Sequence, residues 1–350
     1  MKIVIVGRVL TSNVERFLSD AFQELGHETQ ILDTLSLGRV LYGPAVARAF
    51  ISVGPVRRTY EPFYDENVNR KVRAFFEREK PDFVVCHNAG ELNSETIEYL
   101  TKTRRVPVGT LVMDDPTTTF YLANYLAAIP YFSHLFVSEK GFIPKLSLLS
   151  QQKIMWLPCG TSPQSYRPVK ATEPEYDQFE CNLGYASTAY GARPPGIYRA
   201  LVLRHVKDFG LRIFGDPGWK LIARKVPEIA DCLHTTGALN SEQMCALFAR
   251  AKIFMSIGHP QMITGVTQRI FDAAAAGAFQ IAEAKAEVLE LFPDQSVETF
   301  STIPELREKT GYYLAHPEER QVRSDNARAR VLAEHTWKHR AHTILETVFG

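Results

Sequence analysis

The sequence predicts an α/β protein built from two domains, each with a doubly wound parallel sheet. Three observations support this fold class. The chain has 350 residues, which is too many for one ordinary core and suits two domains. Short apolar runs alternate with helical patterns in both halves, and a proline-rich stretch around residues 158–174 interrupts the alternation between them.

The first half begins with a continuous apolar run at residues 2–6, as expected for a parallel strand buried on both faces. Apolar residues then recur at helical spacing over 13–25, with Ser12 or Asn13 as the predicted N-cap and Gly26 as the stop. Further strands are expected at 29–32, 83–86, 106–113, 135–138 and 154–157, and further helices at 65–79, 94–103 and 120–129.

The alternation resumes after the proline-rich stretch. Strands are expected at 182–185, 211–214, 253–257 and 278–282, and helices at 195–208, 241–251 with Ser241 as N-cap, 266–276, 303–315 and from 317 to the end. We find no internal repeat with a period of 20–50 residues. The sequence therefore predicts two facing Rossmann-like domains at 1–160 and 179–330, joined by a linker at 161–178.

Composition narrows the function classes. Forty basic and 39 acidic residues give a net charge of +1, so bulk attraction to nucleic acid or to anionic lipid is not expected. No apolar run reaches the ~18–20 residues that a membrane span needs, so stable membrane insertion is not expected either. The five cysteines form no Cys-x-x-Cys pair, which favours reduced thiols in a cytoplasmic protein.

The most informative segment is 264–277, an alanine-rich helix that follows a strand and a polar loop. Its glycine lets a ligand approach the backbone, and the free N–H groups of a helix start attract anions. Arg269, near the start of this helix, could bind a diphosphate through two hydrogen bonds. The carboxylate of Asp272 could accept hydrogen bonds from the ribose hydroxyls. The alternative is a buried core helix without a ligand. The residues assigned to this site are Gly265, Val266, Thr267, Arg269 and Asp272.

This segment resembles the donor-binding helix of GT-B glycosyltransferases, and the second half resembles the CgeB-like group in particular. The resemblance covers roughly residues 106–345, whereas the first hundred residues match only in their general Rossmann pattern. The matching pieces, in order, are 157–160, 166–168, 182–187 with Arg193, 211–215 with 218–219, 251–253, 265–277, 312–314 and 335–340.

The resemblance implies a GT-B enzyme whose last segment, 331–350, crosses back onto the first domain. It implies transfer of a sugar from a nucleoside diphosphate sugar, a UDP- or dTDP-sugar, bound by the second domain, to an acceptor bound by the first. No metal or further cofactor is implied. Many retaining relatives carry two glutamates eight positions apart in this region. Asp272 aligns with the second, but Thr264 stands at the first, so stereochemistry stays open.

The resemblance implies further donor contacts at the ends of two strands of the second domain. Gly184 and Ser187 belong to a loop near the diphosphate, with Arg193 as a phosphate partner. Gly215 opens space after the next strand, and Trp219 borders the base. The alternatives are a plain strand-to-helix turn for the first group and a core aromatic for Trp219.

Three side chains of the first domain are candidates for catalysis. Asp114 and Asp115 end a predicted strand and could supply a general base, or could instead cap the following helix. They lack the single intervening residue of the metal-binding acidic motif, so no metal is predicted. His87 ends another strand and could contact the sugar or act as the base, the alternative being a structural histidine.

Two other patterns receive a structural interpretation. The first strand is followed by residues 7–13, which lack Gly-x-Gly-x-x-Gly, so a dinucleotide cofactor is not expected. The group His335, Trp337, His339 and Arg340 is assigned to packing of the last helix rather than to a metal.

Two rival functions remain at this stage. A sugar-nucleotide epimerase or hydrolase would use the same fold, and a non-catalytic partner or sensor would bind the donor without turnover. The sequence names neither the acceptor nor the oligomeric state.

Overall fold

The computed structural model divides into two compact units, Met1–Pro158 with Trp337–Gly350 (unit 1) and Cys159–Thr336 (unit 2). It describes residues 1–350 except 10–12, 35, 38–53, 88, 116, 118–122, 171, 190–191, 235–236 and the side chains of 54–64. Ser12, with residues 10 and 11 of the loop at 7–13, and the start of the helix predicted at 120–129 therefore lie outside the described residues.

Unit 1, as far as it is described, contains a six-stranded sheet of order β2-β1-β3-β4-β5-β6 with every neighbouring pair parallel. The inner strands β1, β3 and β4 are buried almost throughout, because helices cover both faces of the sheet. The strands are β1 (Lys2–Gly7), β2 (Glu28–Asp33), β3 (Phe83–His87), β4 (Val108–Val112), β5 (His134–Val137) and β6 (Lys153–Trp156).

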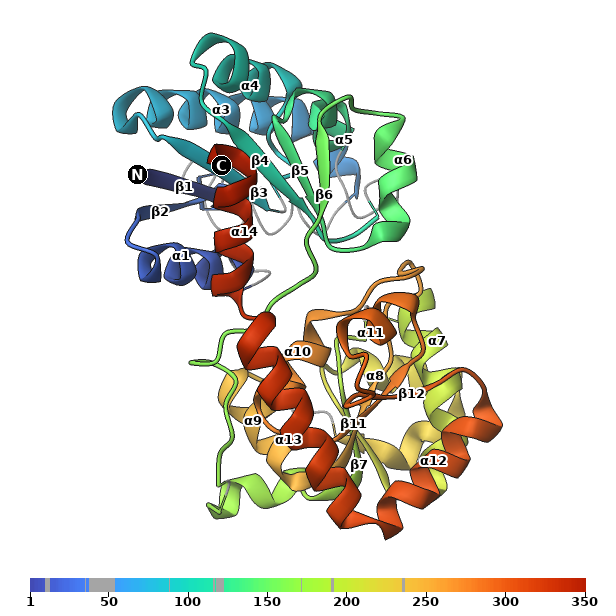
Figure 1. The fold of residues 1–350 in the computed structure, drawn as a ribbon. Helices are drawn as coiled ribbons and strands as arrows, with labels where there is room; N and C mark the ends of the chain where they lie inside the picture. Colours follow the sequence, from blue (N-terminus) through green and yellow to red (C-terminus); the bar gives the residue numbers. More distant parts are fainter. Residues whose placement is uncertain are drawn as a thin grey trace. The chain divides into compact units, whose positions relative to one another are not determined.

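The helices of unit 1 pack on opposite faces of this sheet. Val68, Ile97 and Tyr125, from α3, α4 and α5, join the strand residues Val4 and Val84 in one core. On the other face α1 lies beside α14, the last helix of the chain (Figure 1). The helices are α1 (Val14–Glu24), α3 (Gly54–Glu79), α4 (Ser94–Glu98), α5 (Ala123–Ala128), α6 (Ile143–Ser147) and α14 (Trp337–Phe349).

Specific contacts make α14 part of unit 1. Its Arg340 donates a 2.7 Å hydrogen bond to the carbonyl oxygen of Pro158, and its Phe349 ring meets Phe83 edge to face at 5.8 Å. Lys338 lies 3.6 Å from Glu24 at the end of α1. The final helix thus packs on the sheet with which the chain begins.

Unit 2, over its described residues, has a second six-stranded parallel sheet, of order β12-β11-β10-β7-β8-β9. The first strand, β7, lies at the centre, and the chain adds two strands on one side before crossing to the other. The strands are β7 (Cys181–Ala186), β8 (Leu211–Phe214), β9 (Leu233–His234), β10 (Ala251–Ser256), β11 (Gln280–Glu283) and β12 (Glu298–Phe300).

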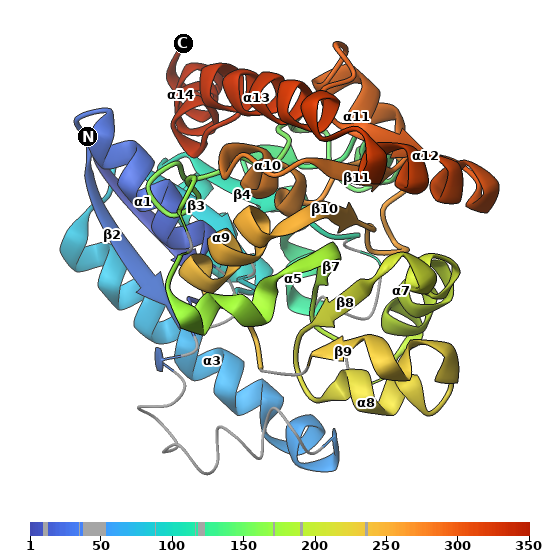
Figure 2. The same ribbon diagram turned by 90° about the horizontal axis from the view of Figure 1, so that it is seen from below.

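Alternating residues of β10 show how this sheet is covered. Ile253 and Met255 join the core formed with α7, α8 and α12, whereas Phe254 meets Phe248 of α9 edge to face at 4.8 Å. Figure 2 shows α7 and α8 on one side of the sheet and α9 and α10 on the other. The helices are α7 (Pro194–Leu203), α8 (Gly218–Ala223), α9 (Ser241–Arg250), α10 (Gln268–Ala275), α11 (Ala286–Leu291), α12 (Ile303–Ala315) and α13 (Pro317–Glu334).

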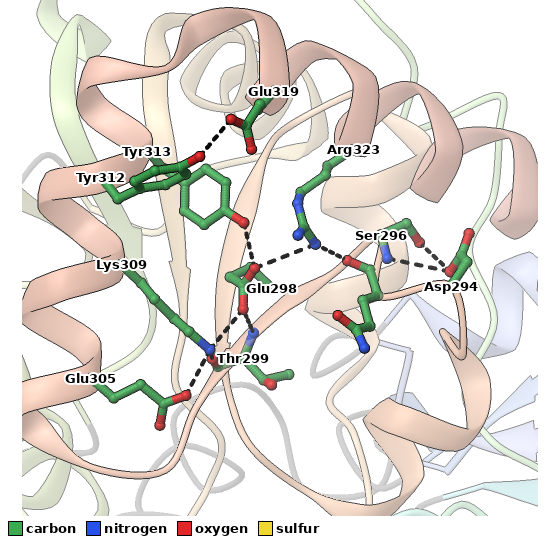
Figure 3. Close-up of polar contacts among 11 residues, drawn as sticks. Asp294, Ser296, Glu298, Thr299, Glu305, Lys309, Tyr312, Tyr313, Glu319 and Arg323 are labelled. Carbon is green, nitrogen blue, oxygen red and sulfur yellow. Dashed lines mark hydrogen bonds and ion pairs between the residues drawn. The ribbon is translucent and has the colours of Figure 1, made fainter.

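A half-buried ion-pair cluster fastens the edge strand β12 to the two helices that follow it (Figure 3). Glu298 accepts a hydrogen bond from the Tyr313 hydroxyl at 2.6 Å and lies 2.8 Å from Lys309 and 3.3 Å from Arg323. Burial alone would raise the pKa of Glu298, but the bonds from Lys309 and Tyr313 hold it below its usual range. Each partner of this carboxylate is satisfied within the fold, which indicates a structural cluster.

Several predicted helices are shorter than their sequence patterns. The predicted 94–103 helix is α4 followed by a π-helical turn at Tyr99–Thr103, and 195–208 is α7 followed by a 3-10 turn at Arg204–Phe209. The prediction of Ser241 as an N-cap is wrong, because Asn240 caps α9 through a capping box with Gln243.

The predicted helix from 317 to the end is also interrupted. It is two helices, α13 and α14, separated at His335 and Thr336. There the chain pairs with Thr161, whose N–H donates to the His335 carbonyl oxygen at 3.0 Å. A backbone partner distant in sequence therefore ends α13.

Candidate functional site

Each sheet has one point where its strand order reverses. In unit 1, β1 lies between β2 and β3, and its last residue Gly7 pairs with His87, the last residue of β3. In unit 2, β7 lies between β8 and β10. Ligands of open α/β sheets bind outside the carboxyl ends of the strands at such points, so the candidate side chains are best judged by their place at these two edges.

In unit 2, α10 begins beyond the carboxyl end of β10. Thr267 is its N-cap residue, with extended backbone, and within the described chain its side chain makes no capping hydrogen bond. Gly265 and Val266 immediately before it are buried. The start of α10 therefore has backbone N–H groups that no Thr267 hydroxyl covers, the arrangement that binds anions at helix starts.

Arg269 lies in the first turn of α10 and is half-buried. Among the described residues its guanidinium takes part in no hydrogen bond or ion pair, although its charge lowers the pKa of both Asp272 and Tyr166. A half-buried arginine usually has an acceptor, because its five N–H donors are costly to leave unsatisfied. The guanidinium of Arg269 is thus a cation that could donate hydrogen bonds to an acceptor on a ligand.

Asp272, predicted to bind the ribose, is 3% exposed. Its carboxylate accepts hydrogen bonds from Thr161 at 2.9 Å and from Gln268 at 3.4 Å. Burial raises its pKa to about 7 against the opposing effects of Arg269 and of these bonds. In this conformation Asp272 fastens α10 to the segment around Thr161, and its ribose role stays a prediction.

Thr264, at the position where the sequence resemblance leads us to expect an acid, has a carboxylate as its partner. Its hydroxyl donates to Glu287 at 2.8 Å, and the Glu287 N–H donates to the Thr264 carbonyl oxygen at 3.0 Å. Nearby, Lys285 donates to the Met262 carbonyl oxygen at 3.1 Å. The start of α11 therefore anchors the loop that precedes α10 and places a buried acid, Glu287, next to Thr264.

The predicted residues at the end of β7 have mixed surroundings. Gly184 is buried within β7, where a Cβ would come within 2.9 Å of Ala251 and 3.0 Å of Leu247, so packing against α9 and β10 explains this glycine. Ser187 follows β7 and is partly exposed, and exposed Arg193 is the N-cap residue of α7. Ser187 and Arg193 remain reachable by a ligand, whereas Gly184 is not.

The pair Gly215 and Trp219 belongs to the interior of unit 2. Trp219 is 0% exposed, donates its indole N–H to the Ser187 carbonyl oxygen at 2.8 Å and meets Tyr185 edge to face. Gly215 is required because a Cβ there would lie 2.3 Å from that same carbonyl oxygen. In this conformation Trp219 packs in the core and does not border a base.

In unit 1, His87 is 3% exposed and forms a 2.8 Å hydrogen bond through Nδ1 with Glu15, the first-turn acid of α1. Beside it, Arg8 pairs with Glu91 at 2.6 Å, and the Thr34 hydroxyl donates to the same carboxylate at 3.0 Å. The carboxyl edge of β1 and β3 thus carries a buried network of paired acids and bases.

The predicted acid pair lies beyond the end of β4. Asp115 is buried and accepts hydrogen bonds from Lys145 at 2.7 Å and from both the N–H and the hydroxyl of Thr117. Burial would raise the pKa of Asp115, but these bonds outweigh it and hold the pKa below its usual range. Because its oxygens are occupied and its pKa is lowered, Asp115 is poorly suited to accept a proton. Asp114 is half-buried beside it.

Four further polar residues at these edges have no local sequence signal of a partner, because their partners are distant in the chain: Glu15, Thr161, Lys145 and Glu287. Only the position of Glu15 could have been predicted from the sequence. It lies in the first turn of a helix that follows a strand, and such a turn lies at the carboxyl edge of the sheet.

No group of three or more His, Cys, Asp or Glu side chains in the described chain is placed to hold a metal ion. No described helix combines the length and apolar character needed to cross a membrane.

Comparisons with known proteins bear on the whole architecture. A family model described as Glycosyl transferase-like matches residues 197–346, which include α10 and the loop before it. The spore protein CgeB of Bacillus subtilis (strain 168) is 23% identical over 262 residues, which are 72% of this chain and 76% of CgeB. The findings support a CgeB-like glycosyltransferase.

Solved structures support the GT-B fold, with two Rossmann-like domains. Sucrose-phosphate synthase from Thermosynechococcus elongatus aligns with a TM-score of 0.70 at 12% identity, covering 99% of this chain and 98% of that one. A glycosyltransferase from Rickettsia africae ESF-5 aligns with a TM-score of 0.65 at 14% identity, covering 99% and 97%. A trehalose-6-phosphate structure from E. coli, bound with UDP-2-fluoro glucose, aligns with a TM-score of 0.64 at 10% identity, covering 99% of both chains.

Proposed function

We propose that this CgeB-like chain transfers a sugar from a nucleoside diphosphate sugar to a hydroxyl acceptor, with the donor bound by unit 2 and no metal required. The observation that carries the proposal is Arg269. It is a half-buried guanidinium without a hydrogen-bond or ion-pair partner among the described residues, in the first turn of α10. A diphosphate supplies the acceptor oxygens that such a group lacks.

The chemistry of the leaving group explains why a cation belongs here. When the bond between the sugar and the diphosphate breaks, negative charge develops on the diphosphate oxygens. Arg269 and the N–H groups at the start of α10 would stabilise that charge in the place of a metal ion. We therefore expect turnover to be unchanged by a chelator.

The fold relatives and the site both support the proposed donor class. One structure of the same fold holds UDP-2-fluoro glucose, which makes UDP-sugars, and the related dTDP-sugars, the first donors to test. Unit 1 would bind the acceptor and supply the proton-accepting group. The five cysteines, all buried and unpaired in the described structure, support a reducing compartment and hence the cytoplasm.

The test is titration calorimetry with UDP and dTDP on the wild type and on Arg269→Ala. Loss of a charge-assisted contact should weaken nucleotide binding about 10–100-fold. Arg307→Ala is the matched control, because Arg307 also lies in unit 2 but pairs with Asp208 on the surface. Asp115→Ala in unit 1 should likewise leave affinity unchanged. Equal affinities for all four proteins would reject the site assignment.

Turnover separates the rival activities. A transferase consumes donor in proportion to an added acceptor, whereas a hydrolase or epimerase converts donor with no acceptor present. A nucleotide that binds through Arg269 but is never converted with any acceptor would favour the non-catalytic sensor.

A further inference from the structure

The carboxyl edge of unit 1 holds a buried histidine–carboxylate pair formed by residues 72 positions apart in the chain. His87 ends β3, and Glu15 comes from the first turn of α1. Their side chains are 3% and 0% exposed, and Nδ1 of His87 lies 2.8 Å from Oε1 of Glu15. The pair lies where β1 and β3 adjoin, at the point of strand reversal.

The two nitrogens of the His87 ring differ in their polar contacts. Among the described residues, the contact with Glu15 through Nδ1 is the hydrogen bond that the ring makes. An ionised carboxylate accepts but cannot donate, so Nδ1 then carries the proton and Nε2 presents a lone pair. A histidine that is nearly buried and has one nitrogen left for a ligand is poised to accept a proton.

Charged side chains beyond the carboxyl ends of β1 and β4 have partners of their own. Arg8 and Thr34 both bond to Glu91, and Lys145 bonds to Asp115. Gly7 leaves the room that Glu15 needs, because a Cβ there would lie 2.4 Å from Oε1 of Glu15 and 2.6 Å from the His87 carbonyl oxygen. The backbone at the end of β1 is thus shaped around this pair.

We propose that Glu15 is a positioning residue that orients His87 and fixes its tautomer for proton transfer. This inference rests on the proposed function. Nε2 of His87 takes the proton of the acceptor hydroxyl while that oxygen bonds to the anomeric carbon. The bond from this carbon to the diphosphate breaks, and the nucleoside diphosphate leaves with the electron pair. Glu15 stabilises the imidazolium that results, as the third member of a nucleophile–base–orienting group does.

A merely structural role for Glu15 is the alternative to exclude. An acid in the first turn of a helix interacts favourably with the helix dipole, so its loss could weaken α1 without affecting catalysis. The two roles differ in their coupling to His87. A positioning residue acts through the histidine and loses its effect when the histidine is gone, whereas a helix-stabilising residue does not.

The experiment is a double-mutant cycle on kcat with the full-length wild type, Glu15→Gln, His87→Asn and the double variant. Glu15→Gln should lower kcat about 10–100-fold with KM for the donor nearly unchanged, and Glu15→Asp should recover part of the loss. In the His87→Asn background, Glu15→Gln should have no further effect. Additive losses in kcat would overturn the proposal.

A second readout does not depend on turnover. Nitrogen-15 spectra of histidine-labelled protein identify the His87 signals by their loss in His87→Asn, and report which ring nitrogen is protonated. The wild type should show protonation at Nδ1, and Glu15→Gln should give a mixture of tautomers, because an amide can both donate and accept. Unchanged His87 signals would overturn the pairing, whereas a tautomer shift in a protein without transferase activity would count against the proposed function alone.

Discussion

The two sheets place opposite kinds of polar side chain at their points of strand reversal. In unit 1 the acids and bases at this edge are paired with one another, as in Glu15 with His87 and Arg8 with Glu91. In unit 2 the guanidinium of Arg269 has no such partner among the described residues. Under the proposed function, two similar α/β units would thus be specialised differently, one to handle a proton and the other to bind an anion.

Removing the base should have the largest effect on this comparison. His87→Asn keeps a donor near the position of Nδ1 for Glu15 but removes Nε2. We expect kcat to fall about 10²–10⁴-fold, because general base catalysis is lost, while donor affinity by calorimetry stays unchanged. A thermal melt controls for folding. A loss of donor affinity instead of kcat would place His87 in binding and erase the contrast between the units.

An effect of intermediate size is expected from Asp272 of unit 2, whose contribution to stability should depend on pH. Its folded pKa of about 7 lies above the ~3.9 of an unfolded aspartate, so the folded protein binds the proton more tightly. The stability from protonated Asp272 is fully present below about pH 4 and is lost as the pH rises to about 7. The free energy of unfolding of the wild type, measured relative to that of Asp272→Asn, should therefore fall from about pH 4 to about pH 7 and stay constant above that.

Urea unfolding at several pH values measures this difference. The asparagine variant is the control, because it keeps an acceptor for the Thr161 hydroxyl without titrating. A difference between the two proteins that does not change from pH 4 to pH 8 would mean that Asp272 is ionised in the fold, and would revive its ribose role.

The smallest effect on function is expected at Trp219. Trp219→Phe leaves the Ser187 carbonyl oxygen without its indole donor and reduces packing, so stability should fall by about 1–3 kcal/mol. Nucleotide affinity should stay within about twofold, since Trp219 is in the core. A large loss of affinity with normal stability would restore the expected position of Trp219 at the border of the base.

Local patterns predicted the fold well where local physics determines it. The apolar runs of β1, β3 and β7 and the alanine-rich α10 appear where their periodicity places them. The N-cap of α9 was predicted wrongly as Ser241, although the local signal for Asn240 was present, because the glutamine of its capping box stands three residues later. Strand order was not readable, since nothing within β9 or β12 records which neighbour each will pair with.

Site residues were predictable only to the extent that their partners are local. Arg269 follows from its place at a helix start, whereas the surroundings of Asp272 depend on Thr161 and those of His87 depend on Glu15. The break between α13 and α14 has no proline or glycine to mark it, because the pairing of Thr161 with His335 and Thr336 produces it. Long-range contacts thus decided which predicted side chains are still available to a ligand.

The return of α14 to unit 1 has a consequence for the order of folding on the ribosome. Unit 2 is one continuous stretch, Cys159–Thr336, and can close as soon as it emerges. Unit 1 precedes it but includes Trp337–Gly350, whose helix packs on α1, so this packing can form only after the whole of unit 2 has been made. The unit that comes first in the sequence is therefore completed after the unit that follows it.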